Sequence, residues 1–260
     1  MAALRSSRII TWRVPLTTAA CALLAAACTS KASTTTSSSA ASSTSSSAVS
    51  QDVAADKALA QAALLKLSDF PTGWTSTPST SNQGSQAIDK QLMSCLHVSP
   101  QFLDSNNPTN VDSPDFSDAN GNTASNSVTY EASASTVQSQ FAILTSSTFV
   151  PCVQAAVNAE ILYAIQHPSN PSDTVPSGLT FGNPTVAQMS FPTLGDQTVA
   201  YRVTVPIMYQ GLSPDAYVDF VAIQKGRAVA VMTFEGVATP FDSSMAEQLS
   251  TLTVGRLANT

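Results

Sequence analysis

The chain is poor in charged residues, in histidine and in glycine. Charged side chains make up 11% of its 260 residues, against roughly 25% in an ordinary globular chain. Its two histidines are too few for a histidine-rich metal site. Its ten glycines form no glycine-rich phosphate-binding loop. Residues 52–260 also contain no Gly-x-Ser-x-Gly nucleophile elbow. The sequence therefore predicts a protein without a metal, a cofactor or a catalytic residue.

Basic residues are especially scarce outside the N-terminus. The chain has 11 basic and 17 acidic side chains, and three of the arginines, Arg5, Arg8 and Arg13, precede residue 28. Eight basic side chains then remain against 17 acidic ones. Nucleic-acid binding needs basic groups that displace phosphate counterions, so this class of function is excluded. The same balance argues against attachment to anionic lipid by surface charge.

Residues 1–27 predict a lipoprotein signal peptide. They contain no acid, and the apolar run from Val14 to Ala27 is 14 residues long, shorter than the roughly 20 needed to span a membrane. Small residues directly precede Cys28, and this segment resembles a bacterial lipobox. The resemblance implies that the Cys28 sulfur carries lipid after the leader is removed. The alternatives are an ordinary secretory signal cut after Ala27, and Cys21 as the modified residue.

Residues 28–51 predict a lipidated cysteine followed by a flexible tether. Of the 22 residues from Thr29 to Ser50, 16 are serine or threonine, one is charged, and none is aromatic. Such a segment has little to bury and is expected to be disordered, with an r.m.s. span of roughly 25 Å. We expect a passive spacer that holds the folded part away from the lipid headgroups.

Residues 52–260 predict a single α+β domain. Helical periodicity dominates the first part, and from residue 179 apolar residues alternate with a period of two. We therefore expect an antiparallel β-meander packed against helices. The expected helices are Asp52–Leu67, Gln86–Leu96, Thr136–Leu144, Pro151–Gln166 and a last one capped by Thr239, with Met245, Leu249 and Leu252 on its buried side; the expected strands are Ser125–Glu131, Val199–Val205, Tyr217–Gln224 and Ala228–Phe234; and residues 104–122 and 168–178 are expected to be loops.

Two cysteines remain in the folded part once Cys21 leaves with the signal peptide and Cys28 carries lipid. An even pair in an exported domain predicts a disulfide, here between Cys95 and Cys152. We expect this bond to connect the second helix with the start of the helix Pro151–Gln166.

Two residues are candidates for contact with a ligand. Glu160 falls inside the apolar stripe of its helix, where a carboxylate must be paired, protonated or at the mouth of a cavity. A structural ion pair with Arg202 or Arg227 is the simpler interpretation, and a ligand contact is the alternative. Trp74, the one tryptophan beyond the leader, is interpreted as a core anchor or as a platform for a ligand.

Three other patterns favour structural roles. Cys95-x-His97 is not followed by further ligands at zinc-like spacing. Asp118-x-Asn120-x-Asn122 is similar to the start of a calcium loop, but Gly121 is misplaced for that motif, so we expect a solvated loop. His167 at a helix end suits the C-terminal helix dipole.

The overall arrangement resembles exported lipoproteins of unassigned function that are common in actinobacteria. It is also similar to the extracellular sensor domain of PknH-type receptor kinases, which implies a disulfide-bonded α+β domain with a cleft. The resemblance rests on Cys28, the Ser/Thr tether, the two separated cysteines, the opening Leu64-Leu65-x-Leu67-Ser68-Asp69-Phe70-Pro71-x-Gly73-Trp74 and the hairpin Lys225-Gly226-Arg227-Ala228-Val229 before a last helix.

We therefore expect a membrane-anchored extracytoplasmic lipoprotein with a sensor-like or solute-binding domain that catalyses no reaction. Its partners would be the membrane, through the lipid, and an unknown small envelope ligand or protein. A polar ligand predicts a concave pocket between the helices and one face of the sheet, with Glu160 or Trp74 on its wall. A carrier of apolar lipid predicts a dry cavity, a hydrolase predicts a histidine beside a nucleophile, and a protein-interaction domain predicts a flat apolar patch.

Overall fold

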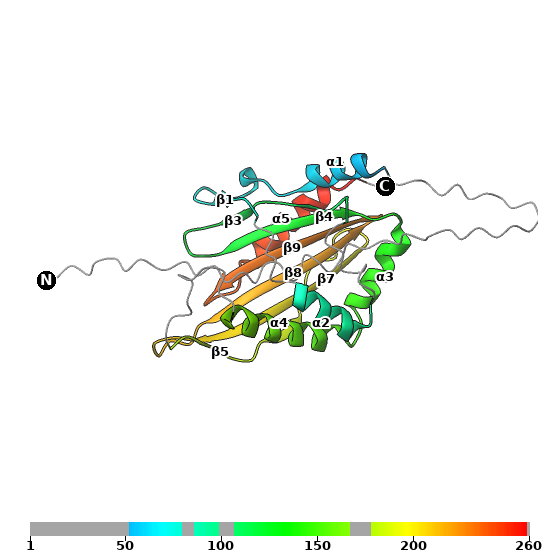
Figure 1. Ribbon diagram of the computed structural model, residues 1–260. Coiled ribbons are helices and arrows are strands. Elements are labelled where there is room, and N and C mark those ends of the chain that lie inside the picture. Colours follow the sequence, from blue (N-terminus) through cyan, green and yellow to red (C-terminus); the bar gives the residue numbers. More distant parts are fainter. Residues whose placement is uncertain (1–51, 80–85, 99–106, 167–177, 259–260) are drawn as a thin grey trace, which may run out of the picture.

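The computed structural model describes residues 52–79, 86–98, 107–166 and 178–258 (Figure 1). The predicted signal peptide, Cys28 and the predicted tether lie outside the described residues. So do His167 and most of the segment 168–178 that was expected to be a loop.

A nine-stranded antiparallel sheet forms the centre of the domain. Its order is β1-β3-β4-β9-β8-β7-β5, with β2 also paired to β4 and β6 also paired to β7. Strands β7, β8 and β9 follow one another in sequence and in space, which is the predicted meander. The strands are β1 (Thr75–Thr77), β2 (Val111–Asp112), β3 (Asp115–Ser117), β4 (Thr123–Tyr130), β5 (Thr180–Phe181), β6 (Thr185–Gln188), β7 (Gln197–Met208), β8 (Asp215–Lys225) and β9 (Ala228–Val237).

Helices pack on both faces of the sheet (Figure 1). On one face, which we call the disulfide face, side chains such as Val199 and Val231 pack with α2, α3 and α4. On the other, the terminal-helix face, residues such as Ala200 and Ala230 pack with α1, α5 and the residues that flank the short 3-10 helix η2. The α+β class is therefore confirmed. The helices are α1 (Val53–Ala63), η2 (Leu67–Asp69), α2 (Gln86–Leu96), α3 (Ala134–Leu144), α4 (Phe149–Gln166) and α5 (Ser243–Arg256).

The segment expected to be one long loop, residues 104–122, contains two short strands. Strand β3 pairs with β1 and with the start of β4, and β2 pairs with residues Ser127 and Val128 of β4. Each has only two or three residues, and their aspartates and serines are typical of loops. Pairing with a long neighbouring strand, and not local propensity, makes these residues extended.

The last helix begins three residues later than predicted. Asp242, not Thr239, is its N-cap, and the Asp242 carboxylate accepts a hydrogen bond from the Met245 amide at 2.7 Å. Leu252, expected on the buried side, is 37% exposed. The intervening Phe241 explains the delay, because its ring packs on Phe234, with centroids 4.9 Å apart, and holds the preceding segment against the sheet.

The opening motif ties the N-terminal segment to the terminal-helix face. The Asp69 carboxylate forms an ion pair with Arg256 of α5 at 2.6 Å, and this hydrogen bond is the largest cause of the lowered pKa of Asp69. The Phe70 ring lies 4.5 Å from the ring of Phe116 and 4.7 Å from that of Trp74. Gly73 has φ of +101°, a conformation that glycine adopts without strain. The motif is therefore explained by packing.

The hairpin between β8 and β9 holds both terminal helices. Lys225 Nζ donates hydrogen bonds to the carbonyl oxygens of Val254 and Leu257, at 3.0 and 2.8 Å, at the end of α5. Arg227 forms an ion pair with Asp56 of α1, whose side chain is 2% exposed. The contacts of Lys225 with α5 and of Arg227 with α1 give the Lys-Gly-Arg turn a structural role.

Candidate functional site

Strand β4 carries hydroxyl groups at every second position on the disulfide face. Its even-numbered residues Ala124, Val128 and Tyr130 belong to apolar clusters on the terminal-helix face. Because successive side chains of a strand alternate between faces, the odd-numbered residues point to the disulfide face. On β9, the positions paired with the first two of them are Glu235 and Thr233. We call this set the polar patch: Thr123, Ser125, Ser127, Thr129, Thr233 and Glu235.

The polar patch borders the apolar part of the same face. Val229 and Val231, further along β9, belong to the core cluster under the helices. In Figure 1, α2 and α4 lie over the side of the sheet that contains β7, and β4 lies away from them. Ser127, Thr129 and Thr233 are buried, whereas Thr123, Ser125 and Glu235 are part-exposed. The accessible end of the patch is thus the end where Thr123 and Glu235 meet.

Glu235 is the carboxylate of the patch. Thr123 Oγ1 donates a hydrogen bond to its Oε2 at 2.8 Å. Its Oε1 is buried and accepts no hydrogen bond from any residue in the described segments. Burial raises the pKa of Glu235 to about 7, assisted by the negative charge of Asp115 on β3 and opposed by the Thr123 hydrogen bond. The carboxyl therefore changes its charge near neutral pH.

Further carboxylates lie on the same face. Asp112 of β2 pairs with Ser127, and it is exposed. Glu131, which directly follows β4, is fully buried and accepts a hydrogen bond from Gln140 Nε2 of α3 at 2.9 Å. Burial raises the pKa of Glu131. The described part of the disulfide face is accordingly rich in hydrogen-bond acceptors.

Several basic side chains, by contrast, lie on the terminal-helix face of the sheet. Lys225, Arg227 and Arg256 bind groups of α1, of α5 or of the segment before β1, and Arg202 binds Asp219. The three arginines in this region each form an ion pair with an aspartate: Arg202 with Asp219, Arg227 with Asp56 and Arg256 with Asp69. The charge of these three arginines is thus neutralised on the terminal-helix face.

The two residues predicted as ligand contacts lie on opposite faces. Glu160 of α4 is 8% exposed, on the disulfide face beside Val157 and Ile161, in the buried stripe as predicted. Trp74 packs on the terminal-helix face, where its ring centroid is 6.0 Å from that of Phe241. They therefore belong to different surroundings, and one ligand does not reach both. Whether either contacts a ligand stays a prediction.

The suggested ion-pair partners of Glu160 were wrong. Arg202 donates through both Nε and Nη2 to Asp219, at 2.6 and 2.7 Å. It lies on the terminal-helix face, with the sheet between it and α4, because it neighbours Ala200 at an even-numbered position of β7. Arg227 is bound to Asp56 of α1.

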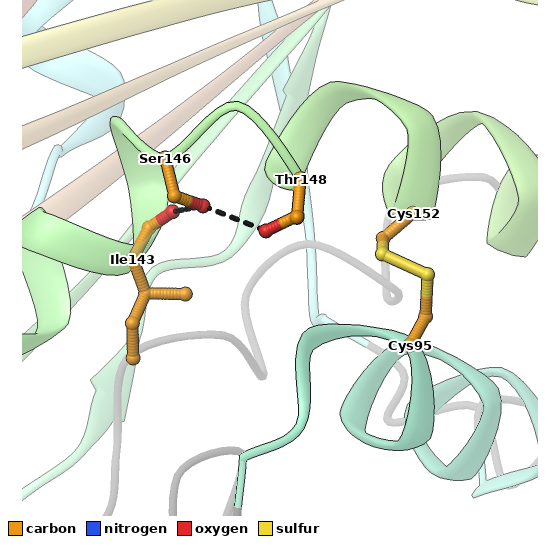
Figure 2. The surroundings of a disulfide bond; sticks show 5 residues. All are labelled: Cys95, Ile143, Ser146, Thr148 and Cys152. Atoms are coloured by element: carbon orange, nitrogen blue, oxygen red, sulfur yellow. Dashed lines mark hydrogen bonds between the residues drawn. A yellow bond between two sulfur atoms is a disulfide. The ribbon is translucent and has the colours of Figure 1, made fainter.

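The disulfide was predicted correctly. Cys95 of α2 and Cys152 of α4 are bonded, with their Cα atoms 5.6 Å apart (Figure 2). In the turn between α3 and α4, Ser146 Oγ donates to the Ile143 carbonyl at 2.8 Å and lies 3.0 Å from Thr148 Oγ1. This turn and the bond together position α4, and with it Glu160, against the sheet.

The calcium-like sequence forms a turn. Asp118 Oδ1 accepts hydrogen bonds from the backbone amides of Asn120 and Asn122, at 2.8 and 3.0 Å, and so closes the hairpin between β3 and β4. His97 is exposed and ends α2 with φ of +54°. Within residues 52–79, 86–98, 107–166 and 178–258, no group of three or more His, Cys, Asp or Glu side chains is placed to hold a metal ion.

Comparison of the chain with protein-family models and with curated proteins identifies no family. No protein-family model matches the chain, and no curated protein matches it in sequence. Among the described segments, no single helix is long and apolar enough to cross a membrane; α3 and α4 pass such a test only as a pair, bent by 76°.

The raised pKa of Glu235 predicts that the free energy of unfolding depends on pH. Its pKa is about 7 in the folded protein, against an ordinary value of 4.5. Between these values the folded state binds more protons than the unfolded state, so stability falls as pH rises from about 4.5 to 7 and is constant above. We expect a loss of about 2 kcal/mol, reduced from the full linkage value because the residue is part-exposed.

Glu235→Gln is expected to abolish this pH dependence. The amide oxygen still accepts the Thr123 hydrogen bond, so the variant should exceed the wild type in stability by about 2 kcal/mol at pH 8. Urea unfolding at pH 5, 6, 7 and 8 measures the difference. Glu247→Gln, at an exposed position of α5, is the matched control and should follow the wild type. Parallel pH profiles for Glu235→Gln and the wild type would contradict the assignment.

Proposed function

We propose that this protein is a lipid-anchored extracytoplasmic lipoprotein whose α+β domain binds a small polar ligand and catalyses no reaction. The polar patch is the observation that carries the binding role. Hydroxyls and a carboxylate from two strands converge there, and the accessible end of the patch offers fixed hydrogen-bond partners for a ligand. The polar character favours a polar ligand over the apolar lipid considered from the sequence.

The export part of the proposal rests on the disulfide and on the N-terminal sequence. A disulfide between two helices is typical of oxidising compartments. Two or more acyl chains on Cys28 would anchor the acidic domain, which its own charge would not do. The resemblance to actinobacterial lipoproteins and to the sensor domain of PknH-type kinases supports a sensor-like role in the envelope.

Native mass spectrometry of the protein extracted from its own membrane tests the binding role. We expect a small molecule to co-purify and to be lost in a variant in which Thr123 and Glu235 are both replaced by alanine. A bare chain in repeated gentle preparations would contradict the binding role.

Substitution of the proposed lipidation site tests the anchor. Cys28→Ala is expected to move the protein from the membrane fraction to the soluble extracytoplasmic fraction, because the acyl chains supply the attachment. Cys21→Ala is the matched control and should stay with the membrane. Fractionation and mass spectrometry of the N-terminus measure both. A Cys28→Ala protein that remains membrane-bound would show that another segment is the anchor.

A further inference from the structure

We propose that the ligand of the polar patch is an organic cation with several N–H donors, such as a diamine. This inference rests on the proposed function, and it specifies the charge of the ligand. The patch offers hydrogen-bond acceptors, and the three arginines of the described segments are bound to aspartates on the other face of the sheet.

Glu235 is the centre of the site. Its Oε2 accepts one hydrogen bond, from Thr123, and its Oε1 accepts none within the described segments. A buried acceptor without a donor costs about 1–3 kcal/mol, and the cost is larger when the group is charged. Glu235 as a residue is part-exposed, and the terminal torsion of a glutamate is broad, so binding at Oε1 requires that the carboxylate rotate toward the ligand. An ammonium group bound there supplies the missing donor and the opposite charge.

Nearby side chains favour a cation over other ligands. Asp115 lies on β3 close enough to affect Glu235 electrostatically, and the exposed Asp112 is beside Ser127. Thr123 and Ser125 are part-exposed residues, and a hydroxyl oxygen has the capacity to accept N–H donors. An anion would meet the two carboxylates of Glu235 and Asp115, and a neutral polyol would forgo the charge attraction.

The ion pairs of the terminal-helix face also favour a positively charged ligand at the polar patch. Arg202, Arg227 and Arg256 are each occupied by a bonded aspartate. Their positive charge is therefore largely neutralised where it lies, and the sheet separates it from the polar patch. The excess of acid over base in residues 52–260 also attracts cations at long range.

Three four-carbon probes of different charge test the inference: 1,4-diaminobutane, 1,4-butanediol and succinate. The probes are titrated into the full-length protein with its disulfide formed, and backbone amide NMR shifts at Thr123, Ser125 and Glu235 are followed. We expect saturable shifts with the diamine, at least tenfold weaker binding of the diol, and no binding of succinate. Binding of the diamine should weaken as salt is raised from 50 to 500 mM.

Two variants locate the site. Glu235→Gln is expected to weaken diamine binding at least tenfold, whereas Glu247→Gln on the other face should leave it unchanged. Equal binding of the diol and the diamine, or no saturable binding of the diamine at 10 mM, overturns the cation inference. The proposed function is judged separately: a co-purifying neutral or anionic molecule would preserve the binding role and reject the cation.

Discussion

Replacing Cys95 and Cys152 together by alanine lowers the free energy of unfolding by about 4 kcal/mol, the first of two large expected effects. The bond joins residues 57 apart in sequence. In the chain-entropy model, closing a loop of this length restricts the unfolded chain by about 4 kcal/mol. For a domain of ordinary stability, about 5–15 kcal/mol, this loss is a large share of the total.

Urea unfolding of three samples separates the bond from the packing of its sulfur atoms. Cys152 is 3% exposed, so the alanine variant also loses core contacts. Wild-type protein reduced with dithiothreitol retains both sulfurs and lacks only the bond, and it should lie close to the double variant. Identical midpoints for the oxidised and reduced wild type would show that the bond contributes nothing to stability.

Asp56→Asn is expected to destabilise the protein by about 3 kcal/mol. The substitution preserves the shape of the side chain but leaves Arg227 without its counter-charge in a largely buried position. Arg227 Nη1 would still donate to the Glu131 carbonyl, at 3.1 Å, which limits the loss. Since α1 is the first described element after the predicted tether, this ion pair connects the N-terminal end of the described chain to the sheet.

A double substitution distinguishes the ion pair from the packing of α1. Asp56→Leu combined with Arg227→Met removes both charges, and we expect it to recover most of the stability that Asp56→Asn loses. Lys57→Gln, at an exposed position of the same helix, should change the free energy of unfolding by less than about 0.5 kcal/mol. Thermal or urea unfolding measures all four proteins. A double variant as unstable as Asp56→Asn would mean that the charges do not account for the effect.

Local signals predicted the helices well. The bounds of α2 agree with the sequence prediction at both ends, and α1 and α3 agree within a few residues. Capping residues and helical periodicity act within one or two turns, so the sequence contains them in full. The N-cap of α5 was misplaced because the docking of residues 236–241 on the sheet decides it, and Phe241 packs there on Phe234. Gly236 of β9 lies so close to the chain at Thr239 that an added Cβ would meet the Thr239 carbonyl oxygen at 2.3 Å.

The sequence did not predict the polar patch, because pairing between distant strands forms it. The alternating hydroxyls of residues 123–129 are visible in the sequence, but nothing local shows that they lie beside residues 233–235. That pairing joins segments about a hundred residues apart, and it determines which face each side chain occupies. Glu235 therefore looked like an ordinary strand residue.

By itself the sequence determined the class of fold, the positions of the helices and the pairing of Cys95 with Cys152. Each follows from periodicity, capping or a count of cysteines, all of which are properties of the chain before it folds. The tertiary structure alone decided that Glu160 and Trp74 lie on opposite faces, that Arg202 and Arg227 bind aspartates, and that Glu235 meets Thr123. Strand register and helix docking bring distant residues together, and these depend on the packing of the whole domain.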